Sequence, residues 1–204
     1  MKIGTVILLV VLGAILGIVI LTILYGVHKY NKMVSQDEKV NNAWAQVETQ
    51  YQRRADLIPQ LVNVVKGAAD YERTTLESVI EARSKATSIQ LTADDLTEEN
   101  LAKFQKAQDQ LSSALSHLMA IHEAYPELKA NENFRDLQAQ LEGTENRIAV
   151  ARKDFNKTVQ DYNSYIRRFP TKIFAGIFGF SQRAYFSSAE GAENAPEVSF
   201  DFGK

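Results

Sequence analysis

Residues 3–27 form an uncharged and almost entirely apolar stretch, and this feature constrains the chain more than any other. The stretch reads IGTVILLVVLGAILGIVILTILYGV, and as a helix it would be roughly 37 Å long, which is enough to cross a bilayer. A cleaved signal peptide would have a shorter apolar core followed by small residues, whereas His28, Lys29 and Tyr30 follow here. We therefore predict that residues 1–28 are a transmembrane anchor that stays attached to the chain.

The anchor and its flanks give two further expectations. Lys29 and Lys32 follow the anchor and only Lys2 precedes it, so the positive-inside rule favours a short N-terminus outside and a cytoplasmic body. This predicts a single-pass protein of the cell (inner) membrane. Within the anchor, Gly13 and Gly17 form a G-x-x-x-G pair that would let two helices approach closely, although such pairs also arise by chance. The predicted partners are thus the lipid bilayer and a second copy of the chain.

The composition of the remaining residues is typical of one all-α domain. The chain of 204 residues has 10 glycines, 4 prolines and no cysteine, and it is rich in residues that favour helices. Its net charge is −2 with both signs interspersed, so no extended basic face is available for nucleic acid. We expect a helical body that does not bind nucleic acid.

The body begins with a long amphipathic helix. Apolar or small side chains recur there in steps of three and four, at Val40, Trp44, Val47, Tyr51, Ile58, Leu61, Val65 and Ala68. This spacing is the mark of a helix face packed on partners. The pattern has no break after the anchor and continues toward Ala86, so we expect one rod that starts at the membrane and is interrupted or bent at Pro59.

Two more amphipathic stretches predict two further helices. The second helix has Thr92 or Thr97 as an N-cap and ends or turns at Pro126, and the third has Asn131 as an N-cap and stops at Pro170. Because the connections are short, neighbouring helices should be antiparallel. The prediction for residues 29–170 is an antiparallel three- or four-helix bundle with long helices, the number depending on how the Pro59 interruption is counted.

Residues 171–186 break the helical pattern. Their core, KIFAGIFGF at residues 172–180, is densely apolar and too short to span a membrane. Its large apolar side chains are Ile173, Phe174, Ile177, Phe178 and Phe180. Attachment to the bilayer surface, contact between copies, and a cap over the end of the bundle are all physically sensible roles for this segment. Residues 187–204 are predicted to be a flexible tail.

Two charged residues fall on or near the apolar stripes. Arg54 lies on the stripe of the first helix, and Glu145 lies close to that of the third. Because burial of an unpaired charge is costly, we predict an ion pair or hydrogen-bonded cluster between the helices, which would fix their register. A catalytic or ligand-binding carboxylate is the alternative.

No other group of residues suggests catalysis, a cofactor or a metal. His117 and His122 are five residues apart, so they cannot share one ion from the same helix face, and adjacent Glu123 does not complete a known motif. The chain has neither a G-x-S-x-G elbow nor a Gly-rich phosphate loop. Trp44 and Tyr51 fit core packing better than a binding cage. We expect no catalytic residues, no cofactor and no metal site.

Long stretches of the body resemble the LemA family. They are VNNAWAQVETQYQRRADLIPQLVNVVKG at residues 40–67, HEAYPELKANENFRDLQAQLEGTENRIAVARKDFN at residues 122–156, YN at residues 162–163, FP at residues 169–170 and FGF at residues 178–180. The resemblance implies a bacterial membrane protein with a short N-terminus outside, one span and a cytoplasmic antiparallel bundle. It implies no particular activity. Tyr71 stands where many relatives carry His before Glu, so imidazole chemistry is not expected there.

These features favour a non-enzymatic scaffold in the membrane. Its copies would associate with one another, and the span, the first helix and the segment near Phe174 would organise or sense the membrane. The alternative is an adaptor that docks another protein or a peptide, such as another membrane protein, through the bundle or the aromatic segment. A third hypothesis is an enzyme with a pocket lined by Arg54, Glu145 or His122.

Overall fold

The computed structural model describes residues 3–68, 73–121 and 125–187. Within these ranges the chain is helical and has no strand, which confirms the predicted all-α fold. In chain order the elements are α1 (Ile3–Ala68), α2 (Arg73–Ser88), the short 3₁₀ helix η1 (Ala93–Asp95), α3 (Glu98–Ile121), α4 (Pro126–Ala130), α5 (Glu132–Arg167) and α6 (Thr171–Phe178).

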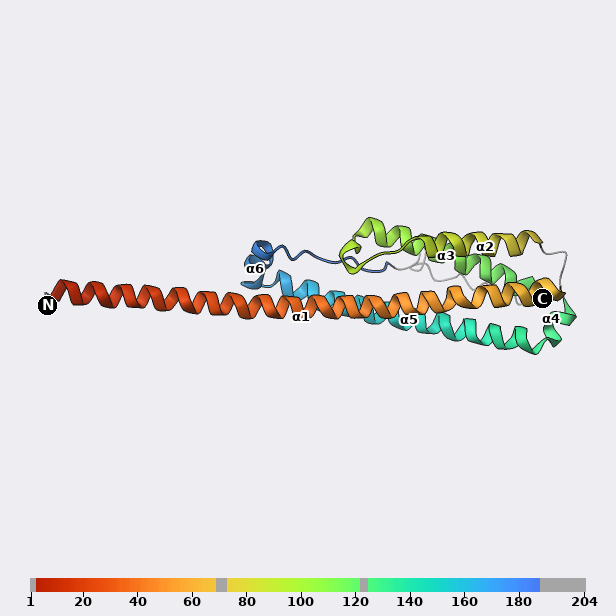
Figure 1. Cartoon of the computed structure of the whole chain (residues 1–204), viewed down its shortest axis with the longest axis horizontal. Coiled ribbons are helices and arrows are strands. Elements are labelled where there is room, and N and C mark those ends of the chain that lie inside the picture. The colour runs from red at the N-terminus through yellow and green to blue at the C-terminus, as the bar shows by residue number, and fades with distance from the viewer. Residues whose placement is uncertain (1–2, 69–72, 122–124, 188–204) are drawn as a thin grey trace, which may run out of the picture.

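Helix α1 extends from the N-terminal anchor into the bundle without interruption (Figure 1). Its apolar part projects beyond the other helices, and no other part of the protein buries its most apolar stretch. The helix also continues through Pro59, although a proline removes one backbone hydrogen bond, so the predicted interruption at this residue is wrong. A continuous helix couples the position of the bundle directly to the position of the anchor.

The predicted extension of the first rod to Ala86 is wrong. Helix α1 ends at Ala68, and α2 begins at Arg73 and runs back alongside α1 (Figure 1). The apolar spacing continues through Leu76 and Val79 because these side chains also enter the core, where they join the same cluster as the last turns of α1. Periodicity indicates which face of a helix is buried, but it does not reveal that the chain has reversed between two such faces.

Four long helices form the bundle. Helix α5 packs antiparallel along α1, and α2 and α3 form a second antiparallel pair (Figure 1). The core near the anchor is aromatic, with Trp44, Tyr51, Phe104, Phe155 and Tyr162 among its members. The core at the far end is mainly aliphatic and is built from leucine, valine and isoleucine side chains of α1, α2, α3 and α5.

Local capping chemistry sets the ends of two helices as predicted. The Thr97 hydroxyl accepts a hydrogen bond from the Asn100 backbone N–H at 3.2 Å, at the start of α3. The Asn131 side chain accepts one from the Phe134 backbone N–H at 3.2 Å, at the start of α5. Helix α5 stops shortly before Pro170, again as predicted.

After α6 the chain becomes extended. Residues 181–187, which we name the C-terminal strap, run back along the bundle and contact α3 and α5 (Figure 1). The predicted flexible tail at residues 187–204 lies outside the described residues except for Ser187.

Candidate functional site at the membrane-proximal end of the bundle

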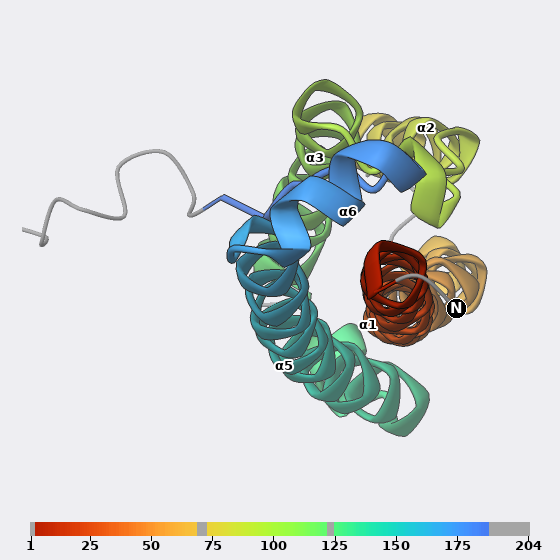
Figure 2. The ribbon, with the colours of Figure 1, turned by 90° about the vertical axis from the view of Figure 1, so that its left-hand side faces the viewer.

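Helix α6 lies across the end of the bundle beside the emerging part of α1 (Figure 2). Its C-terminus is set by Gly179, which has φ 78°, a left-handed conformation that favours glycine. The following backbone N–H, from Phe180, donates to the Ala175 carbonyl at 2.9 Å. This turn sends the strap back along the bundle and leaves α6 beside α1.

Close packing joins α6 to α1 where the apolar stretch ends. The Phe174 ring packs edge-on against Tyr25, with ring centroids 5.9 Å apart. Gly26 is buried beneath the same ring, and a Cβ added there would lie 3.2 Å from Cε1 of Phe174. A larger residue at this position would push α6 away from α1, so the small size of Gly26 permits the contact.

A second aromatic contact completes the junction one helical turn further along α1. Tyr30 packs edge-on against Phe178 and Phe180, with ring centroids 5.0 and 5.8 Å away. Tyrosine is favoured at the boundary between lipid and water because its ring is apolar and its hydroxyl is polar. The residues that fasten α6 therefore lie at the level where α1 leaves the apolar zone.

The outer face of this junction remains apolar and exposed. Thr171 and Ala175 of α6 are buried against the bundle, whereas Ile173 and Ile177 are 53% and 69% exposed. Phe169, in the turn before α6, is 83% exposed. Helix α6 therefore caps the end of the bundle and also presents an apolar surface, so two of the roles proposed for this segment are compatible with each other.

Basic residues flank the elements that form this apolar surface. We name the five of them at the junction the basic collar: Lys29, Lys32, Arg167, Arg168 and Lys172. The ammonium group of Lys29 lies over the rings of Tyr25 and Tyr165, at 5.1 and 5.8 Å from their centroids. All the others are exposed. An apolar face with basic residues at its edge has the chemistry of an interfacial helix.

The structure also brings Arg54 and Glu145 together, halfway along the bundle. Arg54 is 1% exposed, and its Nη1 donates to Glu145 Oε1 and to Ser112 Oγ, both at 2.7 Å. Its Nη2 donates to Gln108 Oε1 at 2.6 Å and to the Gln108 carbonyl at 3.3 Å. One guanidinium group thus joins α1, α3 and α5.

This polar cluster has the character of a structural tie. The expected burial of Glu145 is not found, because its side chain is 43% exposed. The Arg54 guanidinium also lies 5.1 Å from the centre of the Tyr51 ring, and burial raises the pKa of that tyrosine. Among the described residues, Arg54 Nε is buried without a hydrogen-bond partner. The cluster lies between the aromatic and aliphatic cores and connects three helices, and its predicted role in fixing their register stays a prediction.

Comparison with known proteins decides the family. The model of the LemA family matches residues 43–200, which is well over half of the chain. The chain belongs to the LemA family. The predicted resemblance is thereby confirmed, and the matched region covers the bundle from residue 43 onward, α6 and the strap.

Individual relatives of this LemA-family chain differ in how much of their length it spans. Magnetosome proteins MamQ 1 and MamQ 2 of Paramagnetospirillum magneticum are each 26% identical over 175 residues, which cover 78% of this chain and 64% of theirs. The chain therefore spans slightly less than two thirds of those relatives. Protein LemA of Metamycoplasma hominis is 23% identical over 164 residues, or 80% of this chain and 71% of that protein. None of these names denotes an enzyme.

The long apolar helix makes this LemA-family chain a single-pass membrane protein. The most apolar stretch of α1 is not buried by other parts of the protein, whereas the core helix of a soluble protein would be. The helix continues directly from this stretch into the bundle. Gly13 and Gly17 have open space around them, with no atom within 4 Å of an added Cβ. Their predicted role in helix pairing stays a prediction.

The described residues contain no cluster of three or more residues able to hold a metal ion. His122 and Glu123, two of the candidates weighed from the sequence, lie outside the described residues. The third hypothesis, an enzyme pocket lined by Arg54, Glu145 or His122, stays a prediction, and of these residues the structure describes Arg54 and Glu145, which are hydrogen-bonded to each other.

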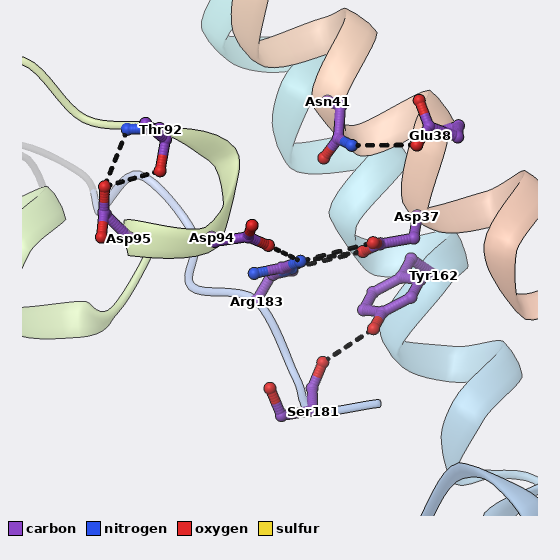
Figure 3. Close-up of polar contacts among 9 residues, drawn as sticks. All are labelled: Asp37, Glu38, Asn41, Thr92, Asp94, Asp95, Tyr162, Ser181 and Arg183. Atoms are coloured by element: carbon purple, nitrogen blue, oxygen red, sulfur yellow. Dashed lines mark hydrogen bonds and ion pairs between the residues drawn. The ribbon is translucent and has the colours of Figure 1, made fainter. Parts of the chain in front are cut away.

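Reasoning from the sequence missed a second polar network, which fastens the strap. Arg183 pairs with Asp37 of α1 and Asp94 of η1, each at 3.1 Å, and Tyr162 of α5 donates to the Ser181 carbonyl at 2.9 Å (Figure 3). Burial is the main cause that raises the pKa of Tyr162 to about 12, and nearby Asp37 adds to it. The one available signal was the polar Asn163 beside Tyr162 on the buried stripe of α5.

Proposed function

We propose that this LemA-family protein is a non-enzymatic membrane scaffold whose bundle is held against the bilayer at two places. One is the apolar part of α1, and the other is the outer face of α6. The packing of Phe174 on Tyr25 and Gly26 carries this proposal, because it fastens an exposed apolar helix at the level where the anchor emerges. Two attachments would hold the bundle at a defined angle to the membrane, which one flexible tether would not.

The energy available from α6 is large enough to matter. Burial of one large apolar side chain is worth roughly 1.5–3 kcal/mol, so Phe169, Ile173 and Ile177 together would contribute several kcal/mol on entering the interface. The anchor already holds α6 beside the membrane, so little additional freedom is lost on contact. Interfacial attachment is therefore favourable even for a short helix.

The basic collar supports a cytoplasmic orientation for the body. Loops rich in Lys and Arg close to a span stay in the cytoplasm, and anionic lipids of that leaflet attract basic residues by about 1 kcal/mol each. Lys29 and Lys32 alone suggest this orientation from the sequence. The fold adds Arg167, Arg168 and Lys172 at the same end of the bundle.

We expect position 177 to contact lipid. Because the chain has no cysteine, Ile177→Cys can be spin-labelled at a single site in the full chain reconstituted in vesicles. Val150→Cys on α5 is the matched control, since Val150 is 58% exposed but lies far from α6 along the bundle. Electron paramagnetic resonance should show the label at 177 accessible to oxygen and shielded from a water-soluble nickel chelate, with the opposite result at 150. Equal exposure of both labels to the chelate would refute the interfacial attachment.

Self-association, the other part of the scaffold proposal, should depend on one face of the anchor. Ile replacing both Gly13 and Gly17 removes the close approach of two helices, whereas Gly4→Ile changes the opposite face of the same helix. Sizing in lipid nanodiscs should give oligomers for the wild type and for Gly4→Ile, and monomers for the double variant. A wild type that stays monomeric across detergents and lipids would contradict self-association.

A further inference from the structure

Two asparagines of α5 hold the main chain of the C-terminal strap. Asn163 accepts a hydrogen bond from the Arg183 N–H at 3.0 Å and donates one to the Arg183 carbonyl at 2.9 Å. Asn156 does the same for Phe186, at 2.9 and 3.0 Å. Each side-chain amide thus replaces the neighbouring strand that an extended peptide would pair with in a sheet.

The spacing of the two asparagines matches an extended peptide. Their positions on α5 differ by seven, which corresponds to a rise of about 10.5 Å along the helix. The two residues that they bind are three apart in the strap, and an extended chain covers about 10 Å over that interval. Because the bonds are made to main-chain atoms, they hold any extended peptide in this register whatever its side chains.

Specificity comes instead from the surfaces on either side of the asparagines. The Arg183 guanidinium lies between the carboxylates of Asp37 and Asp94 (Figure 3), a setting that selects a basic side chain. Ala184 is 8% exposed, and its N–H donates to the Leu96 carbonyl at 3.2 Å. The space at this position is therefore limited to a small residue.

An aromatic site completes the pattern three residues after the arginine. Phe186 is 5% exposed, and its ring lies 6.0 Å from Trp44 and 5.5 Å from Phe155. The Arg152 guanidinium covers it at 4.7 Å. Tyr185, between the two buried positions, is 47% exposed, and its hydroxyl accepts a hydrogen bond from Asn163 Nδ2 at 3.1 Å.

We propose that this face of α1, η1, α3 and α5 is a binding site for an extended peptide of a partner protein with the pattern basic, small, half-exposed, aromatic, and that the strap occupies it within the same chain. The strap shows which peptide fits, and the paired carboxylates supply charge complementarity. A tethered strap has an effective concentration in the millimolar range, so a partner peptide must bring further contacts or be held at the same membrane. This inference goes beyond the scaffold function and gives the adaptor alternative a defined site.

The test uses a labelled synthetic peptide, SQRAYFS, which has the sequence of residues 181–187. In the full detergent-solubilised chain, Arg183→Glu with Phe186→Ala weakens the strap and leaves the binding residues of α1 and α5 intact. Fluorescence anisotropy should show saturable binding to this variant and at least tenfold weaker binding to the wild type, whose own strap competes. The same peptide with Glu in place of Arg should bind at least tenfold more weakly to the variant.

Adding Asn156→Ala and Asn163→Ala of α5 to the variant with the weakened strap should abolish peptide binding. Circular dichroism must show wild-type helix content in each variant, and Arg183→Glu alone replaces the double change if that variant does not fold. Absence of saturable binding to a folded strap variant would overturn the proposal, as would equal binding with and without the two asparagines. Because no lipid is present, these outcomes are independent of whether α6 contacts the membrane.

Discussion

Replacing Arg54 with methionine is expected to lower the free energy of unfolding of the bundle by about 3 kcal/mol. Arg54 is 1% exposed and donates four hydrogen bonds to residues of α3 and α5. Methionine fills much of the same volume, so the loss comes chiefly from Gln108 and Ser112, which would keep polar atoms near the core without their charged partner. Urea unfolding of the detergent-solubilised chain, followed by circular dichroism, measures the effect.

Glu145→Gln is the control that separates charge from hydrogen bonding at this cluster. Glu145 is 43% exposed, so water screens its attraction to Arg54, and in the variant the guanidinium keeps Ser112 and Gln108 as acceptors. The substitution keeps a hydrogen-bond acceptor and should cost at most about 1 kcal/mol. A smaller loss for Arg54→Met than for Glu145→Gln would show that the ion pair, and not the burial of Arg54, dominates the cluster.

Trp44→Ala is expected to destabilise the bundle by about 4 kcal/mol, because it would leave a large cavity in the aromatic core. Trp44 is 2% exposed, and its ring lies 5.4 Å from Phe104 and 5.6 Å from Phe155. These neighbours belong to α3 and α5, so they cannot close the gap without moving whole helices. Urea unfolding followed by circular dichroism is the suitable measurement, since the variant lacks the single tryptophan of the chain.

Trp44→Phe tests whether packing is the main contribution of this residue. The substitution keeps an aromatic ring but loses the hydrogen bond from the indole N–H to the Leu91 carbonyl, which is 2.9 Å long. We expect a loss of about 1–2 kcal/mol, well below that of Trp44→Ala. Equal losses for the two variants would show that the hydrogen bond to the loop before α3 matters more than the volume of the ring.

The predictions that held depended on chemistry within a few residues. Thr97 and Asn131 cap helices because a short side-chain oxygen reaches the backbone N–H groups of the next turn. The stripes on α1 and α5 were visible because a helix repeats every 3.6 residues or so. Pro170 follows the end of α5 because proline disfavours the helical conformation in the residue before it.

The chain reversal before α2 was not visible from the sequence for a physical reason. Leu76 and Val79 belong to the same core as the last turns of α1, so the apolar spacing continues across the reversal. Burial of apolar surface has no direction, and a buried stripe therefore does not say which partner covers it. The four-residue interval before Arg73 lies outside the described residues.

For this LemA-family protein, the sequence alone determined the apolar anchor, the helical body and the family, because these depend on local composition, period and motif. Only the tertiary structure placed α6 beside Tyr25 and Gly26, and it alone showed Arg183 held by Asp37, which is 146 residues away in the chain. Such contacts depend on how the helices pack as a whole. No local pattern encodes the distance between two side chains that only the finished bundle brings together.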